Sequence, residues 1–199
     1  QVNLLQRQRR RVAQFVQNGR NQAFPLAPFY HSSPTSPLNE EQRRAVLFIA
    51  TQPDRVLAFK AQRAREKTAL LQEARRAVEA QGMCMQAFAP TASATTNLRE
   101  TGFAEAQTIA RLLLDPQLQA GLRGEGMLID EAGLLSSKTL GQVFEVAHRQ
   151  NCRVLLVGDP QQHKAVERGD ALRVLIAQGV LKPFVLTNLK TRQGLDLVV

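Results

Sequence analysis

The chain has 199 residues, which is enough for one domain with a substantial core and an additional arm. Apolar residues make up 44% of it, an ordinary share for a globular protein, and no apolar run is long enough to span a membrane. We therefore expect no membrane insertion, and no secretory signal is evident. The net charge of +9 favours a polyanionic partner. With 5% aromatic residues and no Trp, platforms for stacking nucleic-acid bases are sparse.

The cysteines and histidines predict no metal site. Cys84 and Cys152 both lie in apolar runs typical of strands, which predicts buried free thiols in a reducing cytoplasm. The histidines are scattered at His31, His148 and His163, and no Cys/His cluster has the spacing of a metal ligand set. A cytoplasmic location is therefore expected.

Residues 1–20 are rich in arginine and contain no acidic residue. Apolar residues recur in them at helical spacing, which predicts one amphipathic helix ending near Asn18 and Gly19. Two interpretations are open: the helix packs on the domain with solvated arginines, or it is an arm that contacts DNA phosphates. The arginines concerned are Arg7, Arg9, Arg10 and Arg11, with Arg20 at the end of the segment.

Residues 21–37 contain four prolines and three serines, which indicates a linker or an extended wrap. We therefore divide the chain into a basic helix with a Pro/Ser-rich linker over 1–37, an organised lobe over 38–193, and a tail over 194–199.

In the lobe, helical patterns alternate with short apolar strands. Helices are expected from an Asn39 cap to Ala50 and over 69–80, 104–114, 138–149 and 170–177. Strands are expected over 55–60, 83–89, 127–129, 153–157 and 184–187. This alternation predicts an α/β fold, a three-layer parallel sheet with helices on both faces. Ligands of such sheets bind at the carboxyl ends of the strands, so the residues after the strands matter most.

Polar motifs follow four of these strands. They are AQRAREKT over 61–68, APT over 89–91, DE over 130–131 and GDPQQ over 158–162. LNEEQR over 38–43 precedes them, and the segment over 186–193 follows. This order resembles superfamily-1 helicases of the RecD type, and most closely the helicase regions of conjugative relaxases of the TraI family. The resemblance covers residues 38–193 and implies a RecA/RecD-like first motor lobe.

The resemblance implies a role for each matching position. Gln42 corresponds to an adenine-contacting glutamine, Lys67 and Thr68 to the phosphate lysine and the magnesium-binding hydroxyl, and Thr91 to a segment that touches single-stranded DNA. Asp130 and Glu131 correspond to the acidic pair that holds magnesium and activates water. Gln162 corresponds to a γ-phosphate sensor beside the DNA, and Arg192 to an arginine that contacts the γ-phosphate.

The phosphate loop departs from its pattern G-x-x-x-x-G-K-[ST], because Ala61, Ala64 and Glu66 stand where glycines are expected. A non-glycine residue in the left-handed conformation costs about 1–2 kcal/mol. A carboxylate about 4 Å from a phosphate costs about 4 kcal/mol at an effective dielectric constant of about 20. Arg63 and Arg65 could restore some attraction to phosphate, but side chains cannot reproduce a backbone cradle.

A second departure follows Thr91, where Ala92 and Ser93 replace the family's glycine and basic residue. We therefore expect a vestigial nucleotide site with no bound Mg-ATP, in a non-catalytic lobe that binds single-stranded DNA within a larger relaxase and helicase. DNA contacts are expected from Arg7, Arg9, Arg10, Arg11, Arg63, Arg65, Thr91 and Gln162. Two alternatives are open: a protein-interaction module recognised by the conjugative secretion machinery, and an active ATP-dependent helicase lobe.

Overall fold

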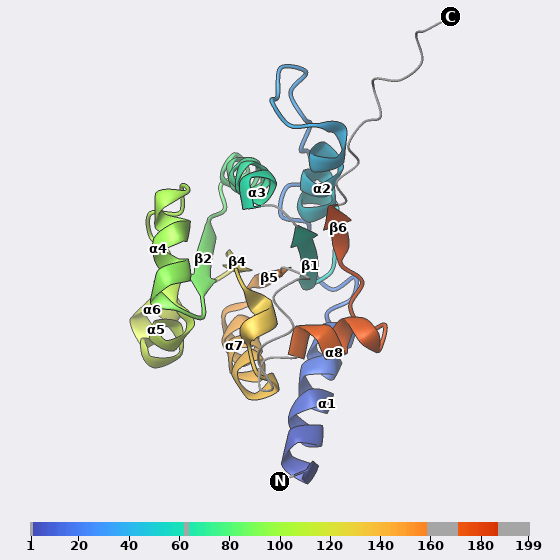
Figure 1. Cartoon of the computed structure of the whole chain (residues 1–199), viewed down its shortest axis with the longest axis vertical. Coiled ribbons are helices and arrows are strands. Elements are labelled where there is room, and N and C mark those ends of the chain that lie inside the picture. Colours follow the sequence, from blue (N-terminus) through green and yellow to red (C-terminus); the bar gives the residue numbers. More distant parts are fainter. Residues whose placement is uncertain (1, 62–63, 159–170, 187–199) are drawn as a thin grey trace, which may run out of the picture.

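A computed structural model describes residues 2–61, 64–158 and 171–186 (Figure 1). Its centre is a six-stranded sheet with the order β3-β2-β4-β5-β1-β6, in which every pair of neighbours is parallel. The strands are β1 (Val56–Ala61), β2 (Met85–Ala89), β3 (Gln107–Thr108), β4 (Gly126–Ile129), β5 (Arg153–Gly158) and β6 (Phe184–Leu186). Strands β4 and β5 are buried along their whole length, as expected for parallel strands covered on both faces.

Helices cover both faces of the sheet, which confirms the predicted three-layer α/β fold. The helices are α1 (Val2–Asn18), α2 (Glu40–Thr51), α3 (Ala64–Glu79), α4 (Ala92–Glu100), α5 (Ile109–Leu114), α6 (Pro116–Ala120), α7 (Ser137–Gln150) and α8 (Ala171–Ala177), with a 3-10 turn η1 (Ala132–Leu134). One apolar cluster joins α1, α5, α7 and α8 to the sheet, around Leu112 and Phe144. The other joins α2, α3 and α4 to the opposite face, around Ile49, Leu70 and Phe59.

Several element boundaries differ from the sequence prediction. The helix expected over 104–114 is wrong at its start, because Gln107 and Thr108 pair with β2 and the Thr108 side chain then caps α5 by accepting from the Arg111 N–H. Helix α3 begins at Ala64, five residues before the predicted start. Helices α4 and α6 and strand β3 were not predicted, because they are short and α4 is rich in Thr and Asn, which have modest helix propensity.

Residues 19–39 contain no helix or strand, yet the first part of this segment is fixed to the domain. Ala27 is fully buried and its N–H donates to the Ala50 carbonyl at 2.8 Å. The Ala23 N–H donates to the Pro53 carbonyl at 2.9 Å. A Cβ atom at Gly19 would lie 2.6 Å from the Arg55 Cβ, so only glycine fits this close approach. The sequence predicted either a linker or an extended wrap for residues 21–37, and the first part of this segment is a wrap.

The cysteines occupy different environments, so the prediction of two buried thiols is wrong for Cys84. Cys84 is exposed and lies just before β2, where its N–H binds the Glu125 carboxylate. Cys152 is buried, and its thiol donates to the Leu122 carbonyl at 3.0 Å. Burial raises the pKa of the Cys152 thiol to about 11, which makes it a poor nucleophile.

Candidate functional site

The carboxyl ends of the central strands surround a cavity of about 400 Å³. Lys67 and Thr68 line it from α3, Asn97 lines it from α4, and Asp130 and Glu131 line it directly after β4. The structure therefore brings together the lysine, the hydroxyl and the acidic pair that the resemblance had assigned to a nucleotide site. The register of the sheet explains this, since Ile129 lies opposite both Phe88 and Leu156, and Lys60 lies opposite Gly158.

Lys67 and Asp130 form an ion pair across this cavity. The Lys67 Nζ lies 2.9 Å from the Asp130 Oδ1 and 3.0 Å from the Oδ2. The Asp130 side chain is only 9% exposed, whereas that of Lys67 is 26% exposed. The Asp130 Oδ1 also accepts from the Glu131 N–H at 2.9 Å, and Glu131 adopts the left-handed conformation with φ of 49°. The ammonium that would meet a phosphate is therefore held by a carboxylate of the same chain.

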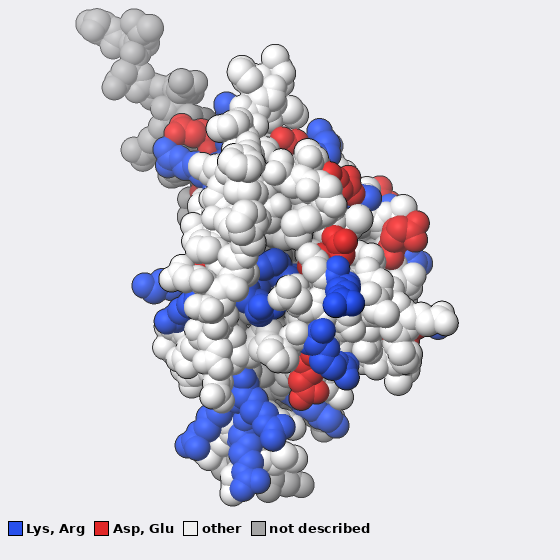
Figure 2. Space-filling view, turned by 180° about the vertical axis from the view of Figure 1, so that it is seen from behind, with Lys and Arg blue, Asp and Glu red and all other residues white. Residues whose placement is uncertain are grey.

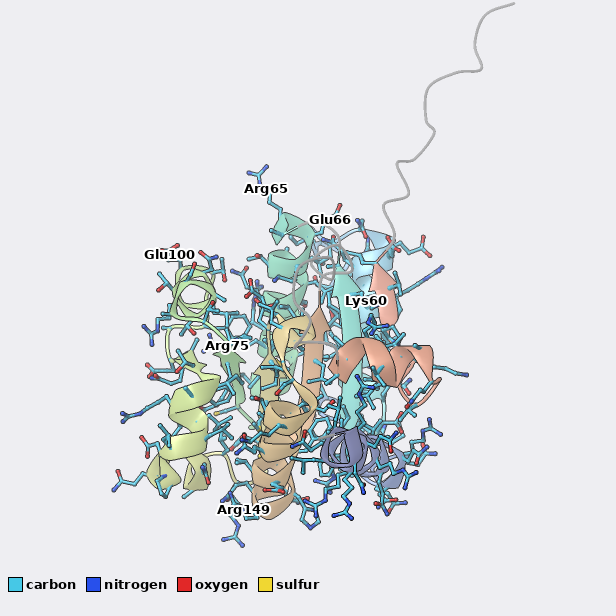
Figure 3. All side chains as sticks on the ribbon, turned by 60° about the horizontal axis from the view of Figure 1, so that its bottom comes forward. Lys60, Arg65, Glu66, Arg75, Glu100 and Arg149 are labelled. Carbon is cyan, nitrogen blue, oxygen red and sulfur yellow. The ribbon has the colours of Figure 1, made fainter. Side chains whose placement is uncertain are left out.

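The start of α3 occupies the place of a phosphate loop. Residues from Ala64 onward are helical, and the Thr68 Oγ1 donates to the Ala64 carbonyl at 3.0 Å, the bond of a regular turn. Arg65 is exposed and projects from the tip of α3 away from the sheet, with Glu66 beside it (Figure 3). The described part of the motif, from Ala64 to Thr68, is therefore the first turn of a helix, whereas Gln62 and Arg63 lie outside the described residues.

Gln42 is buried, and both ends of its amide are engaged. Its Oε1 accepts from the Asn39 N–H at 2.9 Å while the Asn39 side chain accepts from the Gln42 N–H, which forms a capping box for α2. Its Nε2 donates to the Glu66 carbonyl at 3.3 Å. Gln42 therefore joins the start of α2 to the start of α3, and the role in adenine contact stays a prediction.

Thr91 is exposed at the carboxyl end of β2 and caps α4, where its hydroxyl accepts from the Ala94 N–H at 3.1 Å. The Thr91 carbonyl accepts from the buried Thr95 hydroxyl at 2.8 Å. Its role in DNA contact stays a prediction. Three other predicted site residues, Arg63, Gln162 and Arg192, lie outside the described residues.

The arginines of α1 lie on another side of the molecule. Val12 and Val16 are buried against the domain, and the Phe15 ring stacks on Phe144 of α7 at 4.5 Å. Arg7, Arg10 and Arg11 are exposed, whereas Arg9 is half-buried. Their predicted contact with DNA is a proposal, but the packing of α1 on α7 holds these charges in fixed positions.

Sequence reasoning missed the buried Arg153 at the start of β5. Its guanidinium donates to the Gln52 carbonyl at 2.7 Å and to the Phe24 carbonyl, and the residue is only 5% exposed. Burial lowers the pKa of Arg153 to about 10, so the side chain remains charged at neutral pH. An arginine at the first position of a strand is usually a surface residue, so the sequence carried no signal of this role.

Within residues 2–61, 64–158 and 171–186, no group of three or more His, Cys, Asp or Glu side chains could hold a metal ion. In the same ranges, no helix is both long and apolar enough to cross a membrane.

A parallel α/β lobe with a lysine, a hydroxyl and an acidic pair at its strand ends has the architecture of a RecA-like nucleotide-binding domain. The chain belongs to the AAA domain family, whose sequence model matches residues 37–194.

The chain is also similar to three proteins named as conjugal transfer proteins. It is 29% identical over 140 residues to "Conjugal transfer protein TraA" of Rhizobium radiobacter, which covers 69% of this chain. It is 30% identical over 146 residues to the protein of the same name from Agrobacterium fabrum, and 30% identical over 142 residues to "Probable conjugal transfer protein TraA" of Sinorhizobium fredii. Each match covers 13% of the relative, so the chain spans about an eighth of the length of these proteins.

Proposed function

We propose that this chain is a non-catalytic, RecD-like helicase lobe that binds single-stranded DNA within a conjugative relaxase and helicase of the TraI type. The proposal combines membership of the AAA domain family with similarity to conjugal transfer proteins. The observation that carries it is the Lys67–Asp130 ion pair in the cavity at the strand ends, where two residues that the resemblance assigns to a nucleotide site bind each other.

Loss of nucleotide binding is supported by the helical start of α3 and by the Lys67–Asp130 ion pair. A triphosphate would have to displace Asp130 from Lys67 and lie beside the Glu66 carboxylate in the first turn of α3. Like charges about 4 Å apart cost about 4 kcal/mol at an effective dielectric constant of about 20, which is nearly a thousandfold in affinity. No Mg-ATP cofactor is therefore part of the proposal.

DNA binding is supported by charge. The chain carries a net charge of +9, and α1 holds its exposed arginines on a helix that is packed against the domain. Because the helix is already ordered, binding of phosphates costs the entropy of the arginine side chains but not that of the α1 backbone. The proposed partners are single-stranded DNA, neighbouring domains of the larger protein and components of the conjugative secretion machinery, and the proposed location is the cytoplasm.

Two titrations test the proposal. Calorimetry with Mg-ATP is expected to give no binding tighter than about 1 mM, and a phosphate-release assay is expected to detect no hydrolysis. Micromolar binding or turnover would show an active lobe instead. Titration of a labelled oligothymidylate is expected to show binding that weakens strongly with salt, by roughly twentyfold to a hundredfold between 50 and 200 mM for three to five phosphate contacts.

The role of α1 is tested by substitution, because deletion would uncover Phe144 and the apolar surface against which Val12 and Val16 pack. The triple variant R7Q/R10Q/R11Q leaves the packed face of α1 intact, since all three side chains are exposed. Each phosphate contact that it removes lowers the salt slope by about 0.7. Unchanged affinity and slope in a folded variant would show that α1 only packs.

A further inference from the structure

Four arginines from separate segments lie one after another in space, along the edge of the domain where the strands begin. We call Arg20, Arg55, Arg123 and Arg149 the amino-edge arc. Its first half is connected by hydrogen bonds: the Arg55 N–H donates to the carbonyl of Gly19, the neighbour of Arg20, at 2.8 Å. The Arg55 Nη2 in turn donates to the Asn151 side chain at 3.1 Å.

The second half continues from Asn151, which caps the end of α7. Arg149 lies in the last turn of that helix. The adjacent Gln150 carbonyl accepts from the Gly124 N–H at 2.8 Å, which fixes Arg123 beside the end of α7. The amino-edge arc is therefore held together by main-chain hydrogen bonds at Gly19 and Gln150, and by the Arg55 side chain at Asn151.

Within the described residues, none of the four guanidinium groups of the amino-edge arc lies within ion-pair distance of a carboxylate. Arg20, Arg123 and Arg149 are exposed. Arg20 donates to the Val180 carbonyl at 2.7 Å and Arg55 to the Cys152 carbonyl at 3.2 Å. Arg149 donates to the neutral Gln119 side chain at 3.1 Å, although Glu145 lies one turn before it on α7. Among the described residues, Arg20, Arg55 and Arg149 therefore have neutral partners, and none of the four charges forms an ion pair.

Two acidic residues that neighbour the amino-edge arc in the sequence, Asp54 and Glu125, bind the main chain. Asp54 accepts from the Asn21 N–H at 2.8 Å, and Glu125 accepts from the Cys84 N–H.

Helix α1 extends the same basic surface. Arg7, Arg10 and Arg11 follow the i, i+3, i+4 spacing of one helix face, opposite the buried Val12 and Val16. The helix ends at Asn18, next to the Gly19 carbonyl that binds Arg55. Figure 2 shows Lys and Arg gathered over α1 and continuing across the lower half of the same face of the molecule.

The opposite edge of the sheet has a different charge balance. At the carboxyl ends of the strands, Lys67 is paired with Asp130, and Glu66 follows Arg65 in the first turn of α3. Figure 3 shows Arg149 at the opposite end of the molecule from Arg65 and Glu66. Among the described residues, a polyanion therefore meets carboxylates beside the cations of the carboxyl edge, whereas the four guanidinium groups of the amino-edge arc have no carboxylate partner.

We infer that the amino-edge arc and the exposed arginines of α1 together form the surface that binds the phosphates of single-stranded DNA, on the side of the sheet away from the vestigial nucleotide site. The inference rests on the proposed function, namely that the chain binds single-stranded DNA. Guanidinium groups bind phosphate through paired N–H donors, which suits a surface with few aromatic residues for stacking. DNA is recognised here by its backbone, without base preference.

The test compares one pair of arginines from each edge, in the full chain. The variant R123Q/R149Q removes two charges from the amino-edge arc, and R43Q/R44Q removes two from the start of α2, which Gln42 joins to the start of α3 at the carboxyl edge. R123K/R149K keeps the charge and serves as the rescue variant. Binding of a labelled oligothymidylate is measured by anisotropy at several salt concentrations, after circular dichroism has shown that each variant is folded.

R123Q/R149Q is expected to bind roughly tenfold more weakly at 50 mM salt, with a salt slope lower by about 1.4, whereas R123K/R149K and R43Q/R44Q stay within about threefold of the unmodified chain. If R43Q/R44Q weakens binding and R123Q/R149Q does not, the DNA lies at the carboxyl edge and the inference is wrong while the proposed function stands. If the unmodified chain binds no oligonucleotide at low salt, both are wrong.

Discussion

The two edges of the sheet use their charged residues in different ways. At the carboxyl edge, Lys67 and Asp130 neutralise each other within a cavity lined by residues that the resemblance assigns to a nucleotide site. At the amino edge, Arg55 and Arg153 donate to main-chain carbonyls and so fasten the wrap and the end of α7 to the sheet. A charged residue at the expected position of a motif therefore does not establish a function until the group that it pairs with is known.

The comparison of the two edges predicts the largest loss of stability for a substitution at Arg153. Substitution by Met keeps the volume of the side chain but removes the donors to the Phe24 and Gln52 carbonyls. Each buried acceptor left without a donor costs about 1–3 kcal/mol, so the free energy of unfolding is expected to fall by about 2–5 kcal/mol. Urea denaturation followed by circular dichroism measures it.

Arg123→Met is the matched control for Arg153, since Arg123 is exposed and its loss is expected to change stability by less than about 0.5 kcal/mol. Equal effects of the two substitutions would show that the wrap does not depend on Arg153.

A smaller effect is expected at the carboxyl edge. Lys67→Ala leaves the Asp130 carboxylate without its cation, and the free energy of unfolding is expected to fall by about 1–3 kcal/mol. This is less than the loss of about 3–5 kcal/mol for a fully buried ion pair, because Lys67 is a quarter exposed and water screens the pair. Affinity for single-stranded DNA is expected to stay within about twofold. A loss of DNA affinity larger than this, in a folded protein, would mean that Lys67 contacts a DNA phosphate.

A double-mutant cycle with Asp130→Asn separates the ion pair from other effects of these substitutions. Coupling between the two positions is expected, since Lys67 contacts both oxygens of the Asp130 carboxylate.

The smallest effect is expected at Thr91, whose hydroxyl caps α4. Thr91→Ala is expected to destabilise the protein by about 1 kcal/mol, as loss of a helix cap usually does, while Thr91→Ser keeps the acceptor and most of the stability. Thermal unfolding of the two variants measures this difference. A marked fall in DNA affinity with Thr91→Ala and not with Thr91→Ser would assign the hydroxyl a second role at the DNA.

The sequence was sufficient to predict the sheet and the layers. Strands β1 and β5 were found because parallel strands buried on both faces are continuous apolar runs, and α7 because its apolar residues repeat with helical period. It was not sufficient for α4, whose polar residues give a weak helical signal until Thr91 caps it. The short β3 exists only through its pairing with β2, which is a contact between distant segments.

For the candidate site, the resemblance placed Lys67, Thr68, Asp130 and Glu131 together, and the structure does so as well. Which group neutralises which could not be predicted, because Lys67 and Asp130 are 63 residues apart and their pairing depends on the sheet register. The amino-edge arc was missed for the same reason: Arg55, Arg123 and Arg149 belong to three separate segments with no shared motif.

The packing of α1 on α7 has a consequence for the order in which the chain folds. During synthesis α1 is made before α7, and the stacking partner of Phe15 is Phe144, more than a hundred residues later. Until α7 emerges, the apolar stripe of α1 lacks this native partner, and loop closure over this distance is entropically costly. Because the packing of α1 depends on contacts distant in sequence, slow folding and a transiently exposed α1 are expected during translation.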